Sequence, residues 1–173
     1  MAKYSFCLSA QSVRDLQREL KEYKKTLNDK VAELMNNLAE KGVETVRANI
    51  VYYGAYFDGD LLNSVKSKVR KSDKNHITVV IQANSKHAVY VEFGTGHIGA
   101  EHPYKGNVPV VYSQGKFIRY NAETDKYYWY YYKYGTWHYT EGLPSRPFML
   151  DSATMLRTTI IQEEIKRVFK DVK

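Results

Sequence analysis

The sequence predicts an α+β fold, in which a long N-terminal helix and a C-terminal helix pack on an antiparallel β-sheet that carries an aromatic-rich β-meander insert. Three observations predict it. Apolar residues recur every three or four positions over residues 13–50, β-branched residues concentrate within 65–83, and tyrosines crowd residues 127–139. At 173 residues, with 43% hydrophobic and 26% charged residues, the chain has ordinary globular composition, and we expect one domain over residues 1–173.

The first helix is predicted by a single apolar face with steps of three and four. Ser12 is the predicted N-cap, because its hydroxyl can accept an unpaired backbone N–H. Gly42 costs about 1 kcal/mol relative to Ala in a helix, so we expect one long helix with a weak point there, or two helices in series. The pattern is also compatible with a coiled coil, although the irregular step from Leu38 to Val43 argues against one. The face comprises Val13, Leu16, Leu20, Tyr23, Leu27, Val31, Leu34, Leu38, Val43, Val46 and Ile50.

A hairpin and a glycine-containing turn follow the helix. Glycines and aspartates at 52–60 predict the helix end, and residues 61–69 lead into a strand that alternates valine with basic residues. Residues 76–83 are the predicted return strand. Beyond them, Tyr90 to Gly96 reads Tyr-Val-Glu-Phe-Gly-Thr-Gly, which predicts an apolar turn or short helix that ends in a bend.

The later part of the chain is predicted to be an antiparallel meander followed by a helix. Residues 108–112 and 116–120 form a predicted hairpin, a turn covers 121–125, and further strands cover 126–132 and 136–140. The last helix opens after Arg146-Pro147, with one apolar face. That face comprises Leu156, Ile160, Ile161, Ile165, Val168 and Phe169.

Composition excludes several classes of protein. No apolar run approaches the roughly 20 residues that cross a bilayer, and the run at Met1–Leu8 is too short for a signal peptide, so we expect a protein made in the cytosol. The single cysteine, Cys7, rules out an intrachain disulfide and a Cys-rich metal site. The formal net charge of +7 is compatible with an acidic partner or nucleic acid, but the basic residues are spread out.

No pattern of catalytic or ligand-binding residues stands out. His97, Glu101 and His102 lack the spacing of helical metal ligands and are expected to be exposed loop residues. The chain has no Gly-x-Ser-x-Gly nucleophile elbow. The glycines at 94, 96 and 99 formally match Gly-x-Gly-x-x-Gly, but no βαβ unit surrounds them and Pro103 follows closely. We therefore expect no enzyme activity, no metal and no cofactor.

Residues 127–139 hold seven tyrosines and two tryptophans. Alternating rings on a strand point to both faces, so we expect both faces to be at least partly covered. Such rings favour a subunit or partner interface, while a private core and a base-stacking surface for nucleic acid remain open. The candidate interface residues are Tyr127, Trp129, Tyr131, Tyr134, Trp137 and Tyr139.

Taken in order, these segments resemble a known family. The long helix, Leu61-Leu62-Asn63-Ser64, the Tyr90-Val91-Glu92-Phe93-Gly94-Thr95-Gly96 motif and the later Pro147-Phe148-Met149 motif are similar to the neck and tail-component proteins of long-tailed, non-contractile bacteriophages. The matching core covers about 12–98 and 143–170, with a β-rich insert at about 104–142. Members commonly follow Pro-Phe-Leu with Pro-Ala, where this chain has Asp151-Ser152.

The resemblance implies a non-enzymatic structural protein of the virion, assembled in the host bacterial cytoplasm. It implies a homo-oligomeric ring at the head–tail junction, which contacts other neck, connector and tail proteins, lies close to the DNA passage and involves no membrane. In this interpretation Glu92 fixes the turn or pairs with a basic neighbour, and Gly94 and Gly96 adopt backbone angles that other residues avoid. The alternative is a basic nucleic-acid-binding module that uses the aromatic β-surface.

Overall fold

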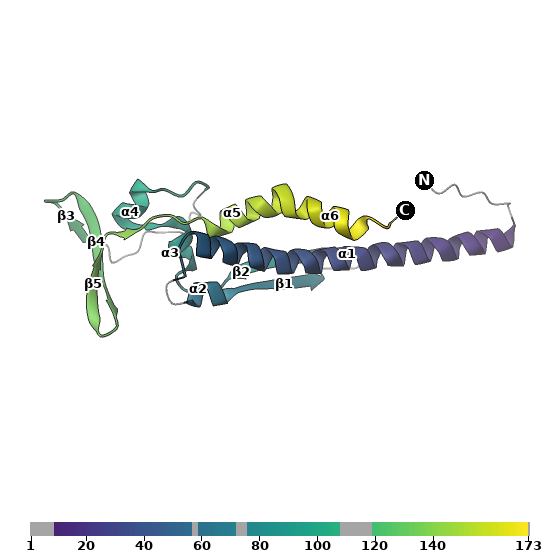
Figure 1. The fold of residues 1–173 in the computed structure, drawn as a ribbon, viewed down its shortest axis with the longest axis horizontal. Coiled ribbons are helices and arrows are strands. Elements are labelled where there is room, and N and C mark those ends of the chain that lie inside the picture. Colours follow the sequence, from purple (N-terminus) through teal and green to yellow (C-terminus); the bar gives the residue numbers. More distant parts are fainter. Residues whose placement is uncertain (1–8, 57–58, 72–75, 108–118, 173) are drawn as a thin grey trace. The chain divides into compact units, whose positions relative to one another are not determined.

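The computed structural model describes residues 9–56, 59–71, 76–107 and 119–172, and it confirms the α+β class (Figure 1). The elements are α1 (Ala10–Tyr52), α2 (Asp60–Ser64), β1 (Val65–Lys71), β2 (Ile77–Ala83), α3 (Ala88–Phe93), α4 (Gly96–Glu101), β3 (Arg119–Asn121), β4 (Lys126–Lys133), β5 (Thr136–Thr140), β6 (Gly142–Leu143), α5 (Phe148–Met155), the π-helical turn η1 (Leu156–Ile160) and α6 (Ile161–Phe169).

The chain groups into two compact units. The first unit holds Met1–Gly42, Ser67–Ile81 and Leu156–Lys173, and the second holds Val43–Lys66 and Gln82–Met155. The single domain expected from the sequence stays a prediction. No helix among the described residues is long and apolar enough to cross a membrane.

Helix α1 begins one turn earlier than the sequence predicts. Ser9, not Ser12, occupies the cap: the Ser9 hydroxyl accepts the Ser12 N–H at 3.1 Å, and the Ser12 hydroxyl lies 3.3 Å from the Ser9 N–H. The Val13 N–H donates to the Ser9 carbonyl, which is the first helical hydrogen bond. Two serines three residues apart therefore cap each other, as in a capping box, and the predicted N-cap is the inner member of the pair.

Gly42 does not break α1, which continues to Tyr52. A Cβ at this position would lie 2.0 Å from Ile81 Cδ1 on β2, closer than atoms can approach. Gly42 is thus a point of close helix–strand contact within the first unit. The helix ends in a Schellman motif of the second unit, where Gly54 has φ +62° and the N–H of Ala55 donates to the Ile50 carbonyl at 2.9 Å.

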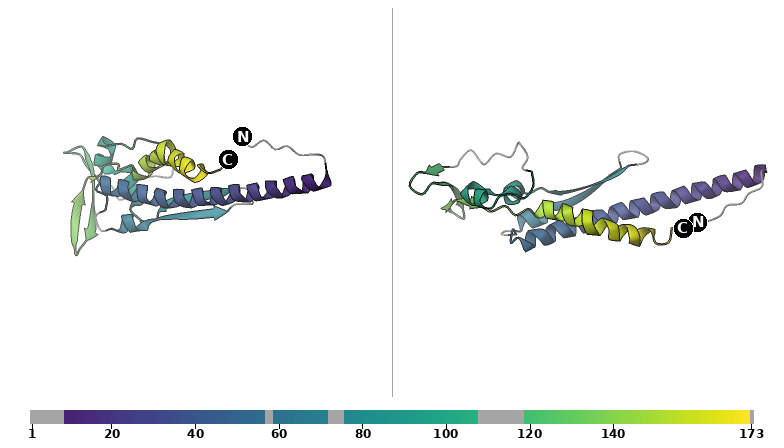
Figure 2. Two further views of the ribbon diagram at one scale, coloured as in Figure 1. Left: turned by 45° about the vertical axis from the view of Figure 1, so that its right-hand side comes forward. Right: turned by 90° about the horizontal axis from the view of Figure 1, so that it is seen from above.

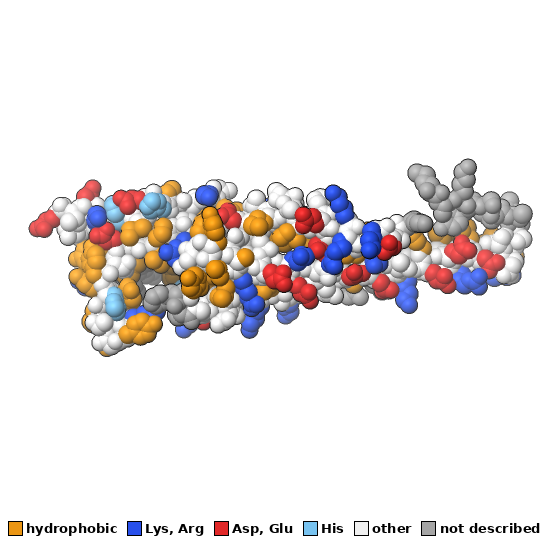
Figure 3. All heavy atoms as spheres, viewed as in Figure 1, with side chains coloured by type: hydrophobic (Ala, Val, Ile, Leu, Met, Phe, Trp, Pro, Cys, Tyr) orange, Lys and Arg blue, Asp and Glu red, His pale blue; other side chains and the backbone are white. Residues whose placement is uncertain are grey.

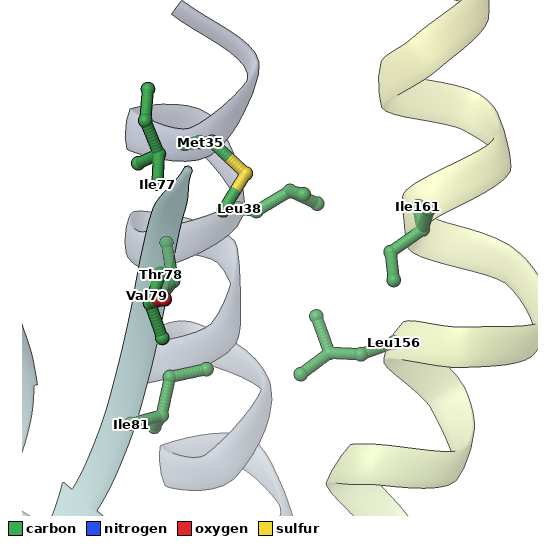
Figure 4. Close-up of a pocket in the computed structure, with 8 residues that line it drawn as sticks. All are labelled: Met35, Leu38, Ile77, Thr78, Val79, Ile81, Leu156 and Ile161. Atoms are coloured by element: carbon green, nitrogen blue, oxygen red, sulfur yellow. The ribbon is translucent and has the colours of Figure 1, made fainter. Parts of the chain in front are cut away.

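In the first unit, α1, the β1–β2 sheet and the C-terminal helical segment surround an apolar groove of about 350 Å³ (Figure 4). Its lining is apolar apart from one threonine. The residues are Met35 and Leu38 on α1, Ile77, Thr78, Val79 and Ile81 on β2, and Leu156 and Ile161 on the C-terminal segment.

A π-helical turn alters the predicted apolar face of the last helix. η1 interrupts the helix before Ile161, and in α6 beyond it Val168 is buried as predicted, whereas Ile165 is 39% exposed. Glu164 is buried instead, and its carboxylate pairs with Arg167 at 2.5 Å and Lys41 at 3.9 Å. The prediction for Ile165 was wrong because its neighbour Glu164 takes the buried position on that side of α6, which the spacing of apolar residues does not reveal.

The second unit contains the short helices, the meander and α5 (Figure 2). Strand β4 pairs antiparallel with β3 and with β5, as the sequence predicts. The β4–β5 turn is formed by Tyr134 and Gly135, both with positive φ, which suits the twist of a two-residue hairpin. The predicted strand 108–112 and most of 116–120 lie outside the described residues.

Candidate functional site

The two family-like motifs, far apart in the sequence, meet around the carboxylate of Glu92. Glu92 lies on α3 and is only 5% exposed. Its Oε2 accepts the Met149 N–H at 2.9 Å, and its Oε1 accepts the Leu150 N–H at 3.1 Å. The Tyr104 hydroxyl donates to the same Oε1 at 3.2 Å. A buried carboxylate thus satisfies two N–H groups in the first turn of α5.

Pro147 explains why a distant carboxylate is needed at this helix end. The Asp151 N–H donates to the Pro147 carbonyl at 3.0 Å, so Pro147 occupies the cap position, although proline has no capping side chain. Glu92 supplies the acceptor from α3 instead, and its negative charge suits the positive end of the helix dipole. Glu92 therefore fixes the turn by capping α5, and no ion pair joins it to a basic residue in the part of the chain that the structure describes.

Burial and hydrogen bonding oppose each other at Glu92. Desolvation raises the pKa of the Glu92 carboxyl, and the hydrogen bonds from Met149, Leu150 and Tyr104 lower it, with a net rise. Burial is the largest cause that raises the pKa of the Tyr104 phenol to about 12, and the nearby Glu92 charge is the next largest. The Tyr104 ring also packs edge-to-face on Phe93, with centroids 4.7 Å apart. Tyr104 is therefore held as a neutral donor.

The backbone joins the same two segments. The Ser145 hydroxyl donates to the Glu92 carbonyl at 2.8 Å, and the Arg146 N–H donates to the Val91 carbonyl at 2.9 Å. Phe148, the central residue of the second motif, is fully buried. The end of α3 and the entry to α5 are consequently fixed to each other by main-chain and side-chain contacts together.

The Gly94-Thr95-Gly96 bend pairs with β6, just before the second motif. Bridges join Thr95 to Leu143 and Gly96 to Gly142, and the Thr95 hydroxyl accepts the Leu143 N–H at 3.1 Å. Gly94 and Gly96 have φ of +75° and +63°, as the sequence predicts. A Cβ on Gly142 would lie 1.9 Å from the Thr95 carbonyl oxygen, so the two backbones meet where no side chain fits.

A second polar cluster ties the end of α1 to α5. Asn49 Nδ2 donates to the Ser152 hydroxyl at 2.7 Å, and that hydroxyl donates to the Phe148 carbonyl at 2.5 Å. The Tyr53 hydroxyl donates to the Asp151 carboxylate, and this hydrogen bond raises the pKa of Tyr53 to about 12. Asp151-Ser152, where this chain departs from the family pattern, therefore forms contacts with α1.

We call the residues that link the two motifs the junction. They are Glu92, Thr95, Gly96, Tyr104, Gly142, Ser145, Phe148, Met149 and Leu150. Tyr90, by contrast, lies on α3 with 43% of its surface exposed and is not part of the junction. The junction consists of hydrogen bonds and bridges that hold segments of the chain together, so its role is structural.

Most rings of the meander are between 44% and 77% exposed, so its two faces are partly covered, in line with the expectation of at least partial cover (Figure 3). The strand register places five rings on one face, which we call the aromatic face: Tyr128, Tyr130, Tyr132, Trp137 and Tyr139. Four of them are between 49% and 67% exposed, and Tyr128 is half-buried. Strand alternation places rings on both faces but does not show what covers the exposed part of each ring.

The six candidate interface residues divide between the faces and the turn. Trp137 and Tyr139 lie on the aromatic face, whereas Tyr127, Trp129 and Tyr131 lie on the opposite one. Tyr134 is in the β4–β5 turn and is 77% exposed. Trp129 is half-buried, and its ring lies so close to Gly96 that a Cβ there would be 2.7 Å from it. Trp129 therefore connects the meander to the junction.

His102 is an exposed loop residue, as expected, whereas His97 lies on a short helix. Residues Gly96–Glu101 form the short helix α4, and His97 Nε2 lies 3.2 Å from Glu101 Oε1 one turn away. Pro103 follows α4 and does not prevent it. Among the described residues, no group of three His, Cys, Asp or Glu side chains could hold a metal ion. The groove of the first unit has no titratable residue in its lining.

Several junction residues lie outside the motifs that the sequence singled out. Tyr104, Gly142 and Ser145 act through contacts with residues between 12 and 53 positions away. Spacing along the chain carries no signal of such contacts. The one available hint is Gly142 beside Leu143-Pro144, where a glycine and a proline flank a short extended segment.

Residues 14–94, just under half of the chain, match the family model of HK97-gp10-like proteins, described as bacteriophage HK97-gp10, putative tail-component. The match confirms the resemblance to phage neck and tail-component proteins, and it ends at Gly94, within the first motif. No curated protein and no solved structure matches the chain.

Proposed function

We propose that this protein is a structural component of the virion at the phage head–tail junction, where copies oligomerise and contact connector and tail proteins around the DNA passage. The observation that carries the proposal is the match of residues 14–94 to a phage tail-component family. The buried junction around Glu92 also supports the proposal, because rigid contacts between the two motifs suit a protein whose role is to bind other proteins. The proposed role has no catalytic step.

The aromatic face is the proposed surface for a protein partner. Its rings combine large apolar area with polar tips and few rotatable bonds, a combination enriched at protein interfaces. Tyr128 stacks on Tyr139 with centroids 5.4 Å apart, and Tyr132 packs against Trp137 at 5.4 Å. The rings therefore form a preorganised surface, which lowers the entropy lost on binding.

The same rings bear on the alternative, a nucleic-acid-binding module. Base stacking needs open ring faces beside unpaired cations. Lys126 is paired with Glu141 at 2.9 Å, and Tyr128 and Tyr139 cover each other. These contacts favour a protein partner over single-stranded nucleic acid. Salt-dependent binding to an oligonucleotide that is lost in Trp137→Ala would support the alternative.

A clean deletion of the gene in the phage that carries it, with complementation in trans, tests the proposal. We expect full heads and complete tails that fail to join, and we expect the wild-type gene to restore infectious particles. A Lys25→Glu variant, altered at an exposed α1 position, should complement as well as wild type. Joined, infectious particles from the deletion strain would refute the proposal.

A further inference from the structure

The N-terminal part of α1 carries an apolar stripe that no described helix or strand of its unit accompanies (Figures 1 and 2). Leu20 is 54% exposed, Tyr23 44%, and Val13 39%. An isolated helix is marginally stable in water, and most helices gain their stability by packing an apolar face. The stripe therefore needs a cover.

The spacing of the stripe changes along α1 at the place where cover within the chain begins. From Val13 to Leu27 the apolar steps run three, four, three, four, which is the heptad seam of a coiled coil. Beyond Leu27 the steps become four, three, four, and the apolar face reaches Met35 and Leu38, which line the groove with β2. The irregular step after Leu38 lies outside the heptad segment. One helix thus presents two faces, one for its own unit and one outward.

The charges beside the stripe identify the partner. With Val13, Leu20 and Leu27 at position a of the heptad, Glu19 falls at g and Lys24 at e of the next heptad. In a parallel pair of identical helices, g of one helix faces e of the next heptad on the other. Glu19 of each copy therefore faces Lys24 of its neighbour, which is an attractive arrangement.

An antiparallel pair would place e beside e and g beside g, so Glu19 at g could not face Lys24 at e and the attraction would be lost. Among the described residues, neither Glu19 nor Lys24 has an ion-pair partner within the chain. The remaining flanking positions, Ser12, Gln17 and Thr26, carry no charge that opposes parallel pairing.

We propose that residues 13–27 of α1 form a parallel, in-register helix–helix interface between copies of this chain. The inference deepens the proposed function, because it rests on the homo-oligomer proposed there and names the surface that joins its members. Copies related by rotation about one axis present parallel helices where those helices run along the axis, so the arrangement is compatible with a ring.

Charge reversal tests the interface in the full-length protein. Glu19→Lys alone and Lys24→Glu alone each place like charges opposite one another. We expect self-association to weaken about tenfold in each, as measured by sedimentation velocity over a concentration series. The double variant Glu19→Lys/Lys24→Glu should return to wild-type association, and a mixture of the two single variants should form mixed oligomers.

The matched controls are Glu22→Lys alone and Lys25→Glu alone, at heptad positions c and f on the outer side of the same helix. Each makes the same change of charge as one of the two single reversals and should leave association unchanged. In a Cys7→Ser background, Leu20→Cys and Leu27→Cys should each form a disulfide with the same residue of another copy. Only a parallel, in-register pair allows both.

The outcomes separate this inference from the proposed function. If the single reversals leave association unchanged while Trp137→Ala abolishes it, the helix interface is refuted and the homo-oligomer stands. Cross-linking at only one of the two leucine positions refutes the parallel register. A wild-type protein that stays monomeric at every concentration, alone and in extracts of infected cells, refutes both.

Discussion

At the scale of single residues, Glu92 links α3, Tyr104 and α5 within the second unit. A charged side chain that is 5% exposed persists because three donors converge on it. The glutamate of the first motif is explained by the proline of the second, since Pro147 leaves the first turn of α5 without a side-chain cap of its own.

Glu92→Gln is expected to destabilise the protein by about 1–3 kcal/mol, because the amide keeps one acceptor and turns its NH₂ group toward a backbone donor. The free energy of unfolding in urea measures the change. Glu44→Gln, an exposed position on α1, is the matched control and should stay within about 0.5 kcal/mol of wild type. Equal effects of the two substitutions would contradict the capping role.

The raised pKa values of Tyr53 and Tyr104 predict that the protein loses stability at alkaline pH. The hydrogen bond to Asp151 raises the pKa of Tyr53 to about 12, and burial does the same for Tyr104. Because both pKa values are higher in the folded than in the unfolded chain, this stabilisation is complete below pH of about 10 and is lost as the pH rises toward 12.

The free energy of unfolding, measured across that pH range, tests whether stability falls as the pH rises. Tyr53→Phe and Tyr104→Phe should each lose less stability than wild type over the range, because phenylalanine does not ionise. Tyr56→Phe, at a position that is 53% exposed, is the control and should follow the wild-type curve. A wild-type stability that stays flat or rises over this range would show that the assigned shifts are wrong.

At the scale of elements, periodicity predicted the long helix, the β2 strand and the meander, and the structure confirms the helix, the strand and the part of the meander from Arg119 onward. The α4 helix was missed because a glycine-rich segment has no apolar period. The role of Glu92 could not be foreseen, since the N–H groups that donate to its carboxylate lie 57 and 58 positions away. Local pattern therefore predicted the elements, and the family resemblance singled out the two motifs. The contact between the motifs could be found only from the structure.

Gly42 gives a test of helix–strand packing in the first unit. Replacing glycine by alanine within a helix normally stabilises by about 1 kcal/mol, but here the new Cβ meets Ile81 Cδ1. We expect Gly42→Ala to give no gain in wild type and a gain of about 1 kcal/mol when Ile81→Val has removed that methyl group. A double-mutant cycle of unfolding free energies measures the coupling, and additive effects would contradict the contact.

Gly142 tests the pairing of the bend with β6. Gly142→Ala should cost roughly 3 kcal/mol or more, because a Cβ would lie 1.9 Å from the Thr95 oxygen and φ is +119°. Gly135→Ala is the matched control, with φ of +80° and no atom within 4 Å of the new Cβ, and should cost only about 1–2 kcal/mol. Thermal unfolding compares them, and similar losses would show that the close approach contributes nothing.

At the scale of the whole molecule, the chain presents two kinds of surface on two units. The first unit carries the heptad stripe of α1, and the second carries the aromatic face next to the junction. The heptad stripe suits copies of the same chain, since Glu19 of one copy faces Lys24 of the other in a parallel pair. The other suits a different protein, since its rings are preorganised and mostly exposed. A component that joins a ring to its neighbours needs both.

The most direct measurement is the location of the protein in purified particles. Gold-labelled antibody against the protein, viewed by electron microscopy of intact virions and of separated heads and tails, should mark the head–tail junction, and mass spectrometry should find several copies per particle. Protein that is absent from purified virions, or label confined to the capsid shell or the distal tail tip, would contradict the account.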